Sequence, residues 1–140
     1  MRADRWYAVE EEPPAAKKPR QWRDKFREAV RGVKCGARGQ SSFSVHFFCA
    51  VVALTAAAVL ECDHWEWCLI IGCIGLVTTA ELINSSIELL FQGLEQEVRD
   101  RVCPCLETAA GAVLVATLTA LAVGGIIFGR KLLLVFHVIA

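Results

Sequence analysis

Residues 67–91 read WCLIIGCIGLVTTAELINSSIELLF, an apolar segment interrupted by only two charged residues, Glu81 and Glu88. A bilayer core about 30 Å thick is crossed by a helix of about 20 mostly apolar residues. Two further segments, 40–60 and 108–129, contain no charged residue and meet the same requirement. The sequence therefore predicts an all-α integral membrane protein with three transmembrane helices.

The composition of the 140-residue chain agrees with this prediction. Hydrophobic residues make up 55% of the chain and charged residues 21%, and the mean hydropathy is +0.44. This apolar content is too high for a chain that is disordered over most of its length. We expect no secretory signal peptide, because the first apolar run begins only near Phe43.

Positive charge is concentrated ahead of the first predicted span. Of the 15 Lys and Arg residues, 11 precede Gln40, whereas the loop 61–67 has none. The positive-inside rule then predicts a multi-pass protein of the cytoplasmic (inner) membrane, with a cytoplasmic N-terminus and a cytoplasmic 92–107 connection. Arg130 and Lys131 fall on the outer side, against the rule. We expect no nucleic-acid partner, because the basic residues are not spread over a folded face.

The segment before the first span divides into two parts. Residues 1–20 combine charge blocks with proline and are predicted to form a disordered charged tail, so the membrane domain is predicted to cover 21–140. Within 21–38, apolar residues such as Trp22, Phe26 and Val30 recur between basic ones. This pattern predicts an amphipathic helix in the membrane interface. The alternative is a solvated helix packed on a partner.

One face of the second predicted span carries the polar residues of chemical interest. Glu81, Asn84, Ser85 and Glu88 recur at i, i+3, i+4 and i+7, so they share a helix face. A carboxylate within a span costs at least about 2.5–3.5 kcal/mol and by default marks a functional site. We expect Glu88 near the cytoplasmic interface, where it can hold a cation, and Glu81 about 15 Å deeper. The alternative is a polar seam for helix association.

The polar face resembles the signature of the prokaryotic diacylglycerol kinase family, which includes the undecaprenol kinases of Gram-positive bacteria. In that signature a glutamate, an asparagine and a second glutamate follow at the spacing of Glu81, Asn84 and Glu88. The resemblance covers roughly 26–128 and includes 108–113 at the start of the third span. Three residues near the start of the first span are also similar to the family: Phe43, Val45 and His46.

The resemblance implies a homotrimeric membrane enzyme that transfers the γ-phosphate of Mg-ATP to the hydroxyl of a lipid alcohol. Diacylglycerol is the first candidate for the acceptor and undecaprenol the second. Glu81 matches the general base, Asn84 its neighbour in the active site, and Glu88 a ligand of the Mg²⁺ that ATP carries. Glu97 lies at a cytoplasmic position that contacts nucleotide in the family.

Four positions depart from the family pattern: Gln40, Gln92, Leu106 and Glu107. Gln92 stands where the family usually has an aspartate. Gln40 replaces a metal-binding glutamate, and we expect it to offer Mg²⁺ a neutral oxygen with less attraction than a carboxylate. Leu106 removes a phosphate-binding cation, while Glu107 keeps the carboxylate that follows it, and the resemblance implies that Glu107 contacts nucleotide. Arg99 and Arg101 are the candidates to replace that cation. These departures predict weakened ATP binding beside an intact catalytic pair.

Two functions of other classes stay open. The alternatives to a kinase are a non-catalytic membrane scaffold on the same fold and a small ion-conducting oligomer lined by Glu81 and Asn84. Small residues in the third span permit close helix approach, so we expect oligomerisation to bury the polar positions of the second span.

Of the seven cysteines, Cys49 and Cys73 lie within predicted spans and are expected to serve as small apolar side chains. The spacing of Cys103 and Cys105 is not that of the common zinc or redox motifs. A disulfide between Cys62 and Cys68 stays open, and His46 is expected to serve the structure of the membrane interface.

Overall fold

The computed structural model describes residues 21–37 and 41–139, nearly all of which are helical. The four helices are α1 (Trp22–Ala37), α2 (Ser41–Val59), α3 (His64–Gln92) and α4 (Gln96–Ile139). These residues contain no strand, so the predicted all-α class is confirmed. The predicted tail, 1–20, lies outside the described residues. The chain divides into two units between Gly32 and Val33, which are described separately.

Helix α1 corresponds to the predicted surface helix. Its apolar side chains Trp22, Phe26 and Val30 are exposed and follow one another at intervals of four residues. Residues at this spacing lie along the same side of a helix. The helix therefore presents an apolar stripe that no other described part of its own unit covers.

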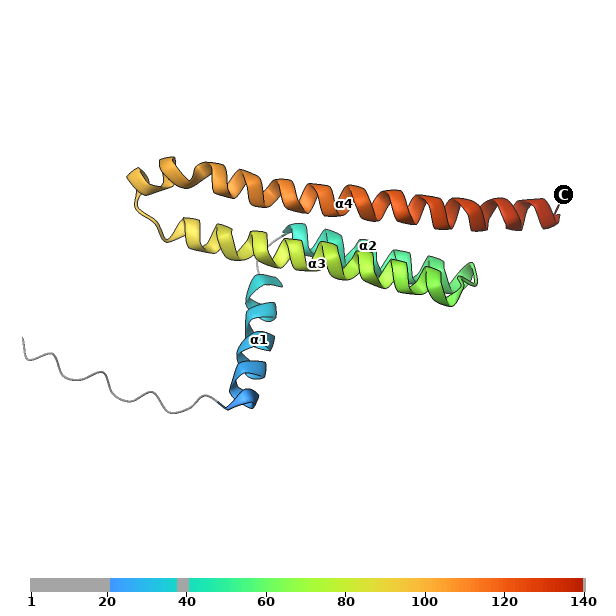
Figure 1. The fold of residues 1–140 in the computed structure, drawn as a ribbon, viewed down its shortest axis with the longest axis horizontal. Coiled ribbons are helices and arrows are strands. Elements are labelled where there is room, and N and C mark those ends of the chain that lie inside the picture. Colours follow the sequence, from blue (N-terminus) through green and yellow to red (C-terminus); the bar gives the residue numbers. More distant parts are fainter. Residues whose placement is uncertain (1–20, 38–40, 140) are drawn as a thin grey trace, which may run out of the picture. The chain divides into compact units, whose positions relative to one another are not determined.

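Helices α2, α3 and α4 lie side by side in the second unit, with α3 packed along α4 and over a smaller contact on α2 (Figure 1). By length and composition all three are able to cross a membrane, at 42–59, 64–92 and 96–136. Many of their large apolar side chains are exposed, for example Leu118, Leu121 and Ile126. Exposed apolar surface on such helices fits contact with lipid tails.

Helix α4 is longer than the span predicted within it. Only 93–95 connect it to α3, and the helix includes the predicted polar connection from Gln96 onward and continues past 129. Hydropathy detects the part of a helix that fits in lipid, whereas the polar residues of 96–107 are also good helix formers. Pro104 lacks the N–H that would bond to the carbonyl of Asp100, yet the helix continues through it.

The turn between α2 and α3 is closed by backbone hydrogen bonds. The N–H of Cys62 donates to the carbonyl of Ala57 at 3.0 Å, and Glu61 has a φ of 49°. This is the left-handed helix end that glycine usually occupies. Lys131 Nζ of α4 donates to the Glu61 carbonyl at 2.9 Å, which holds the unusual conformation in place.

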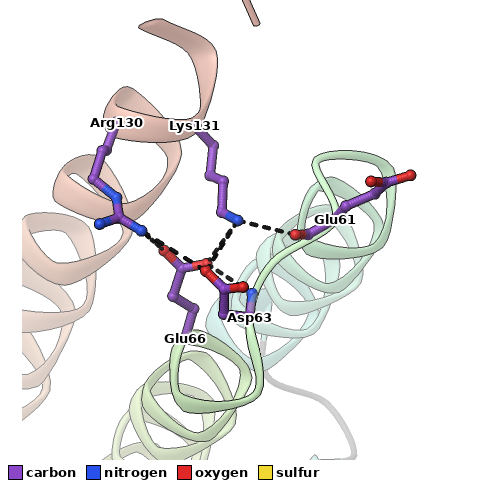
Figure 2. Close-up of polar contacts among 5 residues, drawn as sticks. All are labelled: Glu61, Asp63, Glu66, Arg130 and Lys131. Atoms are coloured by element: carbon purple, nitrogen blue, oxygen red, sulfur yellow. Dashed lines mark hydrogen bonds and ion pairs between the residues drawn. The ribbon is translucent and has the colours of Figure 1, made fainter. Parts of the chain in front are cut away.

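Four side chains form an ionic cluster at this end of the bundle: Asp63, Glu66, Arg130 and Lys131 (Figure 2). Glu66 is 0% exposed. It accepts hydrogen bonds from the backbone N–H of Asp63 at 2.8 Å and from Arg130 Nη2 at 2.9 Å, and Lys131 Nζ lies 3.2 Å away. The ionic cluster therefore ties the first turn of α3 to α4.

A small apolar core lies close to the ionic cluster. Ala57 of α2, Ile70 of α3 and Ile127 of α4 are buried together, and Ile70 is one helical turn from Glu66. Buried contacts from three helices together with the ion pairs fix the register of α3 against α4. That register sets which residues of α2 and α4 meet the polar face of α3.

Candidate active site

The polar face predicted on α3 lies inside the helix bundle. Glu81 is 2% exposed and Asn84 is 7% exposed, Ser85 is fully buried, and Glu88 is half-buried. Oligomerisation was predicted to bury these positions, but Glu81, Asn84 and Ser85 are already buried within one chain. The packing of α2 and α4 on α3 buries these side chains, whereas their burial was predicted to come from neighbouring subunits.

Glu81 lines a small apolar pocket between α2 and α3 with a volume of about 200 Å³. Aromatic and aliphatic side chains form most of its wall, including Phe43 and Leu54 of α2 and Ile74 of α3. An ionised carboxylate is strongly disfavoured in such surroundings unless a donor or cation lies nearby. The pocket therefore combines an apolar enclosure with a single carboxylate at its wall.

His46 is the group that faces this carboxylate. It lines the same pocket from α2, and its Nε2 lies 3.9 Å from Glu81 Oε2. The sequence predicted only an interfacial structural part for His46, so this contact was missed. The signal that marked it was the match of Phe43, Val45 and His46 to the family pattern.

Asn84 and Glu88 form a second polar pair one turn further along α3. Asn84 Nδ2 donates to Glu88 Oε1 at 2.7 Å, which orients the carboxylate. The Asn84 Oδ1 atom is buried and has no hydrogen-bond partner within the described residues. A buried acceptor without a donor is costly, so the Asn84 amide oxygen stands out as an unsatisfied group next to Glu88.

The donor atoms of this pair fit Mg²⁺ better than a transition metal. Magnesium takes oxygen ligands and is usually held by one or two carboxylates together with substrate phosphates and water. Within 21–37 and 41–139 no three His, Cys, Asp or Glu side chains gather as a protein-only metal site. Glu88 and the Asn84 oxygen thus suit a metal that arrives with its phosphate ligands. Gln40, the other predicted ligand, lies outside the described residues.

Arg99, predicted to contact nucleotide, has structural partners in the turn between α3 and α4. Its Nε donates to the Leu94 carbonyl at 3.0 Å, and its Nη2 donates to the Gln92 carbonyl. The guanidinium also lies 5.7 Å from the centre of the Phe91 ring. Arg99 therefore holds the end of α3 against the start of α4.

The two other predicted nucleotide-contacting residues are exposed on α4. Glu97 lies in its first turn, and Glu107 accepts a weak contact from Cys103 Sγ at 3.9 Å. Within the described part of the chain, neither forms an ion pair. Their carboxylates are thus accessible from solvent at the same end of the bundle as the α3–α4 turn.

An open apolar groove lies on the other side of α3, between α3 and the first half of α4. Its volume is about 570 Å³, and Leu76, Ile83 and Ile87 face Pro104 and Ala112 across it. These α3 positions lie on a different helix face from Glu81 and Asn84. The groove therefore belongs to the outer surface of the bundle rather than to the polar site.

The cysteines take no part in the site. All seven are free, including Cys62 and Cys68, so the disulfide that the sequence left open is not formed.

The ionic cluster was also missed in the sequence, where Arg130 and Lys131 were an exception to the positive-inside rule. The sequence signal for the ionic cluster was the presence of two acidic residues near the start of α3, Asp63 and Glu66, which match the two basic residues in number.

Comparison with known proteins identifies relatives whose names are those of kinases. The family model for prokaryotic diacylglycerol kinase matches residues 27–128. A protein named diacylglycerol kinase from Synechocystis sp. is 32% identical over 71% of this chain and 58% of its own length. A protein named undecaprenol kinase from Bacillus subtilis is 30% identical over 76% of this chain and 87% of its own length. No solved structure matches the chain significantly.

Proposed function

The chain belongs to the prokaryotic diacylglycerol kinase family, and from this premise we propose that it is a multi-pass membrane kinase acting on a lipid alcohol. The observation that carries the proposal is Glu81, a carboxylate 2% exposed at the wall of an apolar pocket within a membrane-length helix. A base that acts on an acceptor dissolved in lipid has to lie within the membrane-spanning part of the protein. A water-soluble acceptor would not need one there.

The proposed reaction transfers the γ-phosphate of Mg-ATP to the acceptor hydroxyl. Glu81 takes the hydroxyl proton while the hydroxyl oxygen forms its bond to the γ-phosphorus. The bond from that phosphorus to the bridging oxygen breaks, and ADP leaves with the electron pair. Phosphoryl transfer depends mostly on positioning and charge stabilisation, so the base has to be fixed close to the bound hydroxyl.

We propose that Glu88 and Asn84 bind the Mg²⁺ of the nucleotide, with Gln40 as a weaker third ligand. The 2.7 Å hydrogen bond from Asn84 orients Glu88, and the unpaired Asn84 Oδ1 supports a ligand at that place. The metal would neutralise phosphate charge during transfer. Glu97 and Glu107 are proposed to face the nucleotide, whereas the structural contacts of Arg99 favour a supporting part at the turn.

Diacylglycerol is the first candidate acceptor because the family model and one relative carry that name. Undecaprenol is the second candidate, since the relative named for it matches at similar identity and over more of its own length. Both acceptors combine a hydroxyl with long apolar chains. The apolar wall beside Glu81 suits that shared chemistry.

We further propose a homotrimer in the cytoplasmic membrane with the N-terminus in the cytoplasm and α1 in the interface. The basic N-terminal region supports this orientation, and the exposed apolar stripe of α1 supports its place at the membrane surface. Reporter fusions at both ends test the orientation. Fusions that report the same side for both ends would contradict three spans.

The deciding experiment incubates the purified full-length protein in lipid nanodiscs with γ-labelled ATP, Mg²⁺ and either diacylglycerol or undecaprenol. We expect label in a lipid phosphate, dependent on Mg²⁺ and absent in Glu81→Gln. An oligomer that labels neither acceptor would instead favour the scaffold. Cation flux through liposomes that is lost in Glu81→Gln would favour the channel.

A further inference from the structure

We propose that His46 is a positioning residue that holds the Glu81 carboxylate for proton transfer, so that the two side chains work as a pair across the α2–α3 contact. This inference rests on the proposed function and deepens it. His46 Nε2 lies 3.9 Å from Glu81 Oε2, and both residues line the pocket of about 200 Å³ between the two helices.

The composition of α2 makes this histidine unusual. Helix α2 contains no Asp, Glu, Lys or Arg, and its titratable side chains are His46 and Cys49. Ionisable residues within membrane spans face the bundle interior and pair with one another. His46 follows this rule, because it is half-buried on the face of α2 that carries Phe43 and Ala50 into the same pocket. The contact with Glu81 therefore accounts for a histidine at this position of a helix that has no charged residue.

Within 21–37 and 41–139, no ion pair between Glu81 and any group other than His46 is present. The charged or titratable residues nearest in sequence are Glu88 to Glu81 on α3 and Cys49 to His46 on α2, and the end of α1, which contacts α3 at Gly36, carries Lys34 and Cys35. Within the described residues, only His46 comes within ion-pair distance of the Glu81 carboxylate. Among the described residues, His46 is thus the side chain placed to support the Glu81 carboxylate.

The distance of 3.9 Å is longer than a hydrogen bond, which spans about 2.7–3.2 Å between heavy atoms. Catalytic contacts are often long in the absence of substrate and shorten when substrate is bound. A small shift of α2 or a rotation of the imidazole brings Nε2–H to Glu81 Oε2. In the proposed complex the other oxygen, Oε1, takes the proton of the acceptor hydroxyl.

This geometry defines what His46 contributes. In the proposed complex it donates one hydrogen bond to Glu81 and fixes the orientation of that carboxylate. It neither touches the phosphate nor takes the proton. Loss of the donor should therefore lower the rate of the chemical step and leave acceptor binding nearly unchanged, because a base displaced by about 1 Å can lose about 100-fold in rate.

The test compares His46→Leu, which removes the donor, with His46→Gln, whose amide nitrogen replaces Nε2. We expect His46→Leu to lower kcat by roughly 10- to 100-fold with KM for the lipid alcohol within about twofold. His46→Gln should recover most of the loss. His64→Leu, at the exposed first residue of α3, is the matched control and should leave both constants unchanged.

Three results would overturn the inference. They are an effect of His46→Leu on KM alone, equal losses in His46→Leu and His46→Gln, or a wild-type rate in His46→Leu. A double-mutant cycle of thermal stability with His46→Leu and Glu81→Gln reports the pairing independently of activity. If the parent protein phosphorylates no lipid alcohol, the proposed function fails; additive effects in the cycle would then also reject the pair, and coupled effects would retain it.

Discussion

Two buried glutamates of the same helix, Glu66 and Glu81, have very different surroundings. Glu66 is 0% exposed and is met by a backbone N–H, a guanidinium and an ammonium at 2.8, 2.9 and 3.2 Å. Glu81 is 2% exposed, and the described side chain that faces its carboxylate is one histidine 3.9 Å away. A buried charge stabilises a fold only when its partners satisfy it. Glu66 is therefore suited to hold the structure and Glu81 to react.

The strongest test of this difference neutralises each glutamate in turn. Glu81→Gln should lower lipid phosphorylation by about 10²- to 10⁴-fold, the usual contribution of a general base, with little change in the thermal midpoint. Glu66→Gln should lower the thermal midpoint by several degrees and preserve the activity of protein that remains folded at low temperature. The measurements are a kinase assay and thermal unfolding of both variants in the same detergent.

Opposite results would remove the distinction. If Glu81→Gln unfolds the protein while Glu66→Gln leaves its stability unchanged, then the polar face of α3 serves helix association instead.

A second test concerns the polar pair next to Glu81. Asn84→Leu removes both the donor that orients Glu88 and the unpaired oxygen beside it. We expect the Mg²⁺ concentration needed for half-maximal activity to rise by about 10- to 100-fold, since loss of a group that supports a metal ligand has effects of this size. Ser86→Ala is the control, because its exposed hydroxyl donates to its own helix at Leu82. An unchanged Mg²⁺ requirement in Asn84→Leu would contradict the metal assignment.

A third test compares the two cations that satisfy Glu66. Lys131 is 13% exposed and also contacts Asp63 and the Glu61 carbonyl, whereas Arg130 is 53% exposed. Exposed ion pairs contribute little to stability and buried ones leave a costly unpaired charge when broken. We therefore expect Lys131→Met to lower the thermal midpoint more than Arg130→Met. Equal thermal midpoints in the two variants would contradict the expectation that the more buried Lys131 contributes more to stability than Arg130.

The smallest expected effect is at Cys62, in the loop beside the ionic cluster. Burial, and then the nearby Glu66 carboxylate, raise the pKa of the Cys62 thiol above its ordinary value, while Lys131 lowers it in part. Because the thiolate is the reactive form, alkylation at neutral pH should be slow and should rise only at alkaline pH. Glu66→Gln should lower the pKa of Cys62 and speed alkylation a few-fold, measured by mass spectrometry. A faster reaction in Lys131→Met would contradict the charge assignment.

Much of the fold could be predicted from the sequence, because its signals are local. Hydropathy over about 20 residues identified the three spans, and the spacing of Glu81, Asn84 and Glu88 identified their shared face. The ends of α4 could not be found in the same way. Hydropathy does not distinguish a polar segment that continues a helix beyond its apolar part from a polar loop, and 96–107 is helical.

The sequence by itself determined that this protein is all-α, that three helices suit a membrane, and that a polar face carries two carboxylates. Each of these follows from residues within a few turns of one another. Only the tertiary structure decided that Glu66 is satisfied by Arg130, 64 residues away, and that Glu81 meets His46 across two helices. A carboxylate's surroundings depend on side chains brought close by packing, and packing joins residues whose distance along the chain carries no signal.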